Sequence, residues 1–287
     1  MARILIVSSV VAGLFLLLLI LERRRPLRSG LHSVVPEVLL NLAISALAFA
    51  VAAGVVRPAV AASIDWTAGR RFGLVHLVSL PAPLRGALAF LCMDLAFYYW
   101  HRLNHVVPPL WRFHNVHHTD PVLGVSTSFR FHFGEVALSA LFRVVQVTAI
   151  GIGFRTYAVY ELAFQANTLF HHSNVRLPIR LERLLNRVLV TPRMHGIHHS
   201  QVREEDLSNY SVVVPWWDRL HRTLRLNVPQ SQVVIGVPAY TQPEDNRFWH
   251  LVSMPFRRQR DYWRTPDGGL VEREPAQRGP DRTQLEE

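Results

Sequence analysis

Residues 88–118 read LAFLCMDLAFYYWHRLNHVVPPLWRFHNVHH, and this stretch decides the architecture of the protein. An apolar run ends in Tyr98, Tyr99 and Trp100, and a histidine follows at once. Aromatic side chains of this kind favour the headgroup level of a bilayer. The stretch therefore predicts a helix that leaves a membrane and presents histidines where it emerges.

The histidines of the chain fall into three tight clusters. One cluster is H-x-x-x-H, and the pattern H-x-x-H-H occurs twice. At this histidine frequency, chance would supply roughly 0.04 copies of H-x-x-H-H per chain, so two copies indicate a metal site. The eight clustered residues are His101, His105, His114, His117, His118, His195, His198 and His199.

Helical spacing predicts how these imidazoles converge. Residues four apart lie on one face of a helix, so His101 and His105 can share one ion. In H-x-x-H-H the adjacent pair diverges by about 100° around the helix axis, so one helix can supply two neighbouring metals. Pro108 and Pro192 are expected to break the helix before the second and third clusters. Eight imidazoles are too many for one ion, and the pattern predicts a site for two metals.

The composition indicates a membrane protein. Of 287 residues, 49% are hydrophobic and only 18% are charged, a balance too apolar for an ordinary soluble domain of this length. Cys92 is the single cysteine, which excludes an internal disulfide framework and a cysteine-based metal cluster. The net charge of +10 is explained better by arginines flanking membrane spans than by a nucleic acid partner.

We expect an all-α integral membrane protein with four to five membrane-embedded helices and a cytosolic helical cap that holds the dimetal site. The first span, residues 4–21, is long enough to cross a bilayer and is followed by Arg23, Arg24 and Arg25. The positive-inside rule then places the histidines on the cytoplasmic side. The other expected spans are residues 38–56, with a loop after them, residues 83–100, and a hairpin over residues 136–170.

Three regions are expected along the chain. Residues 1–82 would form N-terminal transmembrane helices, and residues 83–226 a histidine-rich catalytic domain that includes the hairpin. Residues 227–287 would form a basic C-terminal region, and the absence of a periodic apolar pattern predicts a disordered tail from about residue 265.

Further candidates lie outside the three clusters. His171 and His172 stand at the end of the hairpin, and spacing does not decide which of them binds metal. His132 is an isolated histidine, which could act on the substrate side or behind a ligand, or could be a plain hydrogen-bonded histidine. Asp94 precedes His101 by two helical turns and is a candidate hydrogen-bond acceptor behind a ligand. An acid within an apolar span is costly and therefore suggests function.

The sequence resembles the fatty acid hydroxylase and sterol desaturase superfamily. The segments that carry the resemblance are DLAFYYWHRLNH, LWRFHNVHH, LFHHSN, MHGIHH and NYSVVVPWWDRLHRTL, which follow in this order between residues 88 and 224. The resemblance implies that the eight clustered histidines, with His171 or His172, bind two non-haem iron ions. Some members carry another histidine where this chain has Asn167.

The resemblance also implies a function. The protein would use O₂ and electrons to hydroxylate or desaturate a C–H bond of a lipid, and the electrons would come from a separate donor protein. The residues leave open whether the lipid is a fatty acyl chain, a sterol or a related compound. A metal-dependent membrane enzyme of another class and a non-enzymatic metal-binding protein remain the alternatives.

Overall fold

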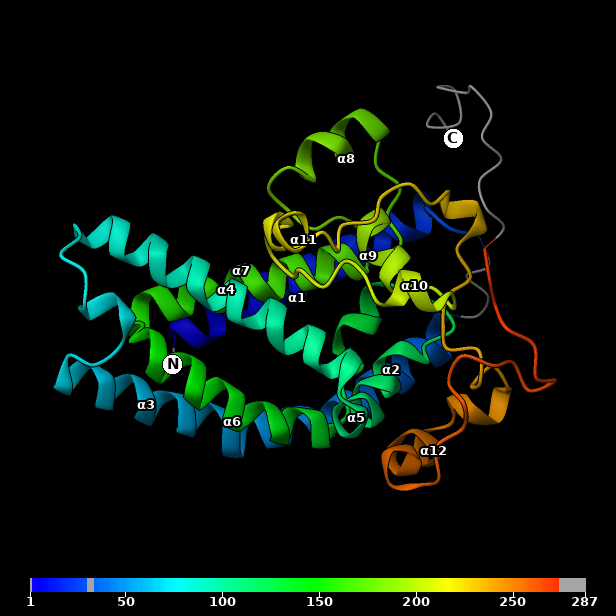
Figure 1. Ribbon diagram of the computed structural model, residues 1–287, viewed down its shortest axis with the longest axis horizontal. Helices are drawn as coiled ribbons and strands as arrows, with labels where there is room; N and C mark the ends of the chain where they lie inside the picture. The colour runs from blue at the N-terminus through cyan, green and yellow to red at the C-terminus, as the bar shows by residue number, and fades with distance from the viewer. Residues whose placement is uncertain (1, 30–33, 274–287) are drawn as a thin grey trace.

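The computed structural model describes residues 2–29 and 34–273, and within these ranges the chain forms helices, with isolated bridges but no named strand (Figure 1). The expected all-α fold class is confirmed. The α-helices are α1 (Ala2–Arg24), α2 (Val34–Val51), α3 (Arg57–Arg70), α4 (Ala82–Val106), α5 (Pro108–His118), α6 (Phe133–Ile150), α7 (Phe154–His172), α8 (Ile179–Leu185), α9 (Pro192–His198), α10 (Arg203–Asp206), α11 (Trp216–His221) and α12 (Phe248–Ser253). A π-helical turn, η1 (Ala52–Val56), joins α2 to α3, and the 3-10 turns are η2 (Leu74–His76), η3 (Val125–Phe129), η4 (Gln230–Gln232), η5 (Pro243–Asn246) and η6 (Met254–Phe256).

The long helices extend to one end of the molecule, and α5 and the short helices α8 to α11 gather toward the other (Figure 1). Helix α4 packs against both α6 and α7, α1 packs against α7, and the joined helices α2 and α3 pack against α6. Met93 and Tyr160 are fully buried where α4 meets α7. The fold thus places α4 centrally, with its histidine end toward the short helices.

Residues 136–170, expected as a hairpin, lie in α6 and α7. The two helices are joined by residues 151–153, and Gly151 adopts a φ of 72°. Its Cα lies so close to the carbonyl of Phe72 that a Cβ would collide with it, so the turn requires glycine. The turn points away from the short helices, and therefore the start of α6 and the end of α7 both reach the histidine end (Figure 1).

The expected loop after residue 56 is wrong, because the helix continues to Arg70 and contains Asp65. Pro58 lies in the first turn of α3, directly after the π-helical turn. Proline lacks an N–H group and normally interrupts a helix, and a π-helical turn is one way to absorb the interruption. The chain therefore continues as one long helix where the sequence suggested an end.

Two stretches, residues 35–76 and 133–150, are helical, long and apolar enough to cross a membrane. Large apolar side chains such as Leu39, Phe49 and Leu141 are exposed on them. Exposed apolar surface of this kind is suited to contact with lipid. The larger count of four to five membrane-embedded helices stays a prediction.

Proline starts the helices that carry the two H-x-x-H-H motifs, as expected. Helix α4 ends at Val106, Val107 is extended, and α5 begins at Pro108. Helix α9 begins at Pro192. The residue before a proline avoids the helical region, so each histidine helix starts in a new direction.

The C-terminal region returns to the short helices. Residues 265–269 form a turn closed by a bridge between Arg264 and Leu270, and Arg273 forms an ion pair with the buried Glu205 of α10. The rest of the predicted tail, residues 274–287, lies outside the described residues.

Candidate metal centre

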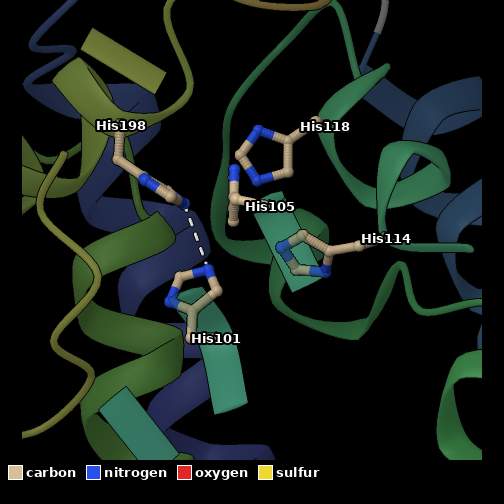
Figure 2. A group of neighbouring side chains, drawn as sticks. All are labelled: His101, His105, His114, His118 and His198. Atoms are coloured by element: carbon tan, nitrogen blue, oxygen red, sulfur yellow. Dashed lines mark hydrogen bonds between the residues drawn. The ribbon is translucent and has the colours of Figure 1, made fainter. Parts of the chain in front are cut away.

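Five histidines from three helices form a first group (Figure 2). Their ligand atoms all lie within 4.8 Å of one another, and all five side chains are buried. The members are His101 and His105 of α4, His114 and His118 of α5, and His198 of α9.

Four more histidines form a second group with the same compactness, within 4.8 Å of one another and buried. The members are His117 of α5, His172 at the end of α7, His195 of α9 and His199, which follows α9. Each H-x-x-H-H motif therefore contributes to both groups. The groups are adjacent, because the rings of His118 and His199 stack with centroids 4.2 Å apart and planes 10° apart.

The Nε2 atoms fit a metal-binding arrangement. In the first group, Nε2 of His198 lies 3.1 Å from Nε2 of His101. In the second, Nε2 of His172 lies 3.0 Å from that of His117 and 3.0 Å from that of His195. Two imidazoles bound at about 2.1 Å and at a right angle to one ion would place their nitrogens about 3.0 Å apart. The spacing therefore suits ligands that share an ion.

Three further Nε2 atoms of the first group, those of His105, His114 and His118, are buried and have no hydrogen-bond partner among the described residues. A buried polar atom without a partner is costly. Coordination of a metal ion would satisfy all three.

Hydrogen-bond acceptors of the protein contact the Nδ1 atoms of the first group, which we call the outer nitrogens. His101 Nδ1 donates to the Tyr210 carbonyl at 2.8 Å, and His198 Nδ1 donates to the Ser208 carbonyl at 2.7 Å. Such bonds fix the tautomer and leave Nε2 free to bind metal.

Two carboxylates complete this outer layer. His105 Nδ1 donates to Asp206 at 2.9 Å, and His114 Nδ1 donates to Glu135 at 2.9 Å. His118 Nδ1 lies 2.9 Å from the second oxygen of Asp206, although its angle does not make a well-aligned hydrogen bond. Asp206 thus contacts rings from two different helices.

The second group is held differently. His172 Nδ1 donates to the Thr168 carbonyl at 2.8 Å, but Nδ1 of His117, His195 and His199 has no hydrogen-bond partner within the described part of the chain. Ring stacking orients His117 instead, because its ring lies on Phe131 with centroids 4.7 Å apart and planes 9° apart.

Burial lowers the pKa of nine histidines in and beside the two groups. Desolvation lowers the pKa of His172 and of His198 to about 3. The same cause, with repulsion from neighbouring imidazoles, lowers the pKa of a further set well below the usual value. That set is His101, His105, His117, His118, His171, His195 and His199. Neutral imidazole is the form that binds a metal ion.

His172 is a member of the second group, whereas His171 lies outside both groups. The His171 ring packs against His195 with centroids 4.0 Å apart, and its Nδ1 accepts a hydrogen bond from Asn167 at 3.4 Å. Asn167 also donates to the carbonyl of Val212. His171 therefore supports a member of the second group and does not join it.

Two other candidates lie away from the histidine groups. Asp94 does not accept from a ligand, because its carboxylate accepts from the backbone N–H groups of Val213 and Val214 and from the Trp217 indole at 2.8 Å. The expectation failed because the segment around residue 214 packs against the face of α4 that carries this acid. His132 caps α6 by accepting from Gly134 N, and its other nitrogen contacts the Val252 carbonyl at 3.0 Å.

Three residues that shape the site were not expected from the sequence. Asp206 ends an acidic run, and Glu135 lies in the first turn of α6. The third is Gly196 in the second H-x-x-H-H motif, where the guanidinium of Arg28 lies so close that a Cβ would collide with it. The sequence offered a signal for Glu135, because this acid stands at the start of an apolar helix that follows a histidine cluster. It offered no such signal for Asp206 or Gly196.

Two adjacent groups of buried imidazoles at the end of a helical bundle define a histidine-rich protein with two sites able to hold metal ions. Residues 86–223 match the model of the fatty acid hydroxylase family. This match confirms the resemblance noted from the motifs.

Several curated proteins are similar to the chain. Ornithine lipid hydroxylase OlsE of Rhizobium tropici is 28% identical over 62% of this chain and 52% of its own length. Alkylglycerol monooxygenase of Homo sapiens is 30% identical over 67% of this chain and 42% of its own length. A cholesterol 25-hydroxylase-like protein of Danio rerio is 28% identical over 52% and 60%. The chain thus spans about half the length of these relatives. No solved structure matches it significantly.

Proposed function

We propose that the protein is a membrane-bound di-iron oxygenase that inserts oxygen into a C–H bond of a lipid. The observation that carries the proposal is the pair of adjacent buried groups, which together bring nine imidazoles close enough to hold metal ions. Two of the relatives are a lipid hydroxylase and a monooxygenase, which favours hydroxylation over desaturation.

Each group would hold one iron. The first iron would be held by the five histidines of the first group and the second iron by the four of the second group. Two bound iron ions would supply the redox chemistry through which O₂ attacks an unactivated C–H bond. Imidazole ligands also suit zinc and copper, so the choice of iron rests on the family.

The protein's own residues orient and protect the site. Asp206 and Glu135 accept hydrogen bonds from Nδ1 of His105 and His114, and such support raises the basicity of a metal-binding ring. Every member of both groups is buried, which excludes water from the reacting atoms. The apolar helices α4, α6 and α7 end at this site and are suited to position a lipid chain.

The location and partners follow the same proposal. Residues 1–82, residues 83–100 and the hairpin of residues 136–170 would be embedded in the membrane, with the histidine groups on the cytoplasmic side. A separate protein would donate the electrons. Residues 83–226 would form the catalytic domain, and the C-terminal region would cover it, as the contact between Arg273 and Glu205 suggests.

Isotope labelling tests the reaction. Membranes that contain the protein would be supplied with reductant and ¹⁸O₂, and their lipids analysed by mass spectrometry. We expect one ¹⁸O atom in a new lipid alcohol and about two irons per chain. Turnover without O₂, or label taken from water instead, would favour a hydrolase and refute the proposal.

Histidine variants supply the controls. His198→Ala in the first group and His195→Ala in the second should each abolish the product, because each removes a ligand. His250→Gln changes a histidine that faces Asp245 outside both groups and should leave turnover unchanged. Equal loss in all three variants would indicate a general folding defect and count against the ligand assignment.

A further inference from the structure

A cavity of about 490 Å³ lies where α1 ends. Arg24, Arg25 and Pro26 line it from the last residue of α1 and the two residues after it, and the short stretch after α7 lines it from the other side with Arg176, Leu177 and Pro178. Three of the six lining residues are arginine and none is acidic. The remaining wall is apolar.

The two lining segments are tied together. Pro26 and Val175 form an antiparallel bridge, and Arg176 N donates to the Arg25 carbonyl at 2.8 Å. The side chain of Asn174 bonds both the N–H and the carbonyl of Arg28, each at 2.9 Å. The arginines of the two segments are therefore held close to one another by the backbone.

Arg176 itself is fixed, because its Nε donates to the Pro26 carbonyl at 3.1 Å. Within the described residues, none of the three lining arginines forms an ion pair. The nearest acid along the chain, Glu22, is buried and accepts from the backbone N–H groups of Val125 and Asn174, at 2.9 Å each. It lies outside the cavity lining, so the positive charge there is left uncompensated by the protein.

The position of the cavity indicates the anion. Residues 4–21 carry no charge, and the cavity opens directly after this apolar helix, which under the membrane location proposed above places it at the level of the lipid headgroups. Arginine suits the geometry of phosphate oxygens, and basic clusters just beyond a membrane helix attract anionic lipids. Pro26, Leu177 and Pro178 can contact the glycerol and the first acyl carbons.

We propose that this cavity binds the phosphate group of an anionic membrane phospholipid. Arg176 follows His172 by four residues, so the bound lipid contacts the segment that leads from the second histidine group. The proposal does not depend on iron or on oxygenase activity, because the binding residues belong to neither histidine group.

Binding can be measured on the full-length protein in detergent. The thermal midpoint would be followed during titration with dioctanoyl phosphatidylglycerol, dioctanoyl phosphatidylcholine, uncharged dioctanoylglycerol and inorganic phosphate. We expect saturable stabilisation by phosphatidylglycerol. The double variant Arg24→Gln/Arg176→Gln should bind about 25-fold more weakly, about fivefold for each lost arginine.

Matched variants separate a site from general charge. Arg183→Gln/Arg187→Gln removes two exposed arginines from the neighbouring α8 region and should keep wild-type affinity. Arg24→Lys/Arg176→Lys keeps the charge and should recover most of the binding, even where the glutamine variant folds poorly. Equal weakening in both glutamine variants, or equal stabilisation by phosphatidylcholine, would overturn the proposal. Saturation by inorganic phosphate at the same concentration would identify a free-anion site and overturn the lipid source.

Discussion

The two histidine groups lie side by side but are held by different interactions. In the first group, protein acceptors contact the outer nitrogen of every ring, and two of the acceptors are the carboxylates of Asp206 and Glu135. In the second group, three outer nitrogens lack a partner among the described residues, and rings such as His117 are oriented by stacking. Hydrogen bonds from carboxylates strengthen metal ligands. The comparison teaches that the two sites should differ in affinity although their ligands are alike.

The largest effect is expected from Asp206→Asn. This change removes the negative charge and replaces one of the two carboxylate oxygens that face His105 and His118. The metal affinity of the first group should therefore fall about 100-fold. Elemental analysis after dialysis should find about one iron per chain instead of two. Glu205→Gln alters the adjacent buried acid, which contacts Arg273 and no histidine, and should keep both. Loss of both irons from Asp206→Asn would show that the groups are not independent.

Removal of the metal ions from the unmodified protein should show the same order of affinities, with the first group binding more tightly than the second. A chelator titration is expected to release the second group's iron first, at a chelator concentration about tenfold lower than that for the first group, because three of its four rings lack an acceptor at Nδ1. In His195→Ala the early phase should disappear, and in His198→Ala the late phase. A single phase in the unmodified protein would contradict the difference between the groups.

Glu135→Gln should have a smaller effect than Asp206→Asn. It weakens the support of one ring, His114, while the amide oxygen can still accept a hydrogen bond. We expect about a tenfold loss of affinity, restricted to the late phase of the chelator titration. An equal shift of both phases would show that Glu135 stabilises the fold and does not act through His114.

The smallest effect is expected from Phe131→Leu. Loss of the stacked ring under His117 should weaken the second group about fivefold or less, the range of one aromatic pair. Phe133→Leu is the matched control, because Phe133 packs on His132, outside both groups. The early phase of the titration should shift in Phe131→Leu alone. A shift of the late phase would refute stacking as the support of the second group.

The convergence of the clustered histidines could be predicted because it depends on local spacing. Residues four apart on a helix lie on one face, as the histidines carried by α4, α5 and α9 do. It could not separate His171 from His172, since adjacent residues on α7 point about 100° apart and only the packing of α7 against α9 decides between them. The helical breaks at Pro108 and Pro192 were predictable for the same local reason.

Residues that act across the fold were not predictable. Asp206 lies in R-E-E-D, a pattern typical of a solvated surface, and it reaches the histidines only because the chain folds back after α9. Asp94 has the spacing to face His101, yet the backbone around residue 214 captures it. The helix through Arg70 depends on a π-helical turn that no residue pattern specifies.

The contact between Asp206 and the rings of α4 and α5 also sets an order of events during synthesis. His105 and His118 leave the ribosome about ninety to a hundred residues before the carboxylate that aligns them. The early helices are therefore synthesised while the first group is still incomplete. The first group can reach its full set of histidines and supporting carboxylates only after residue 206 has been translated.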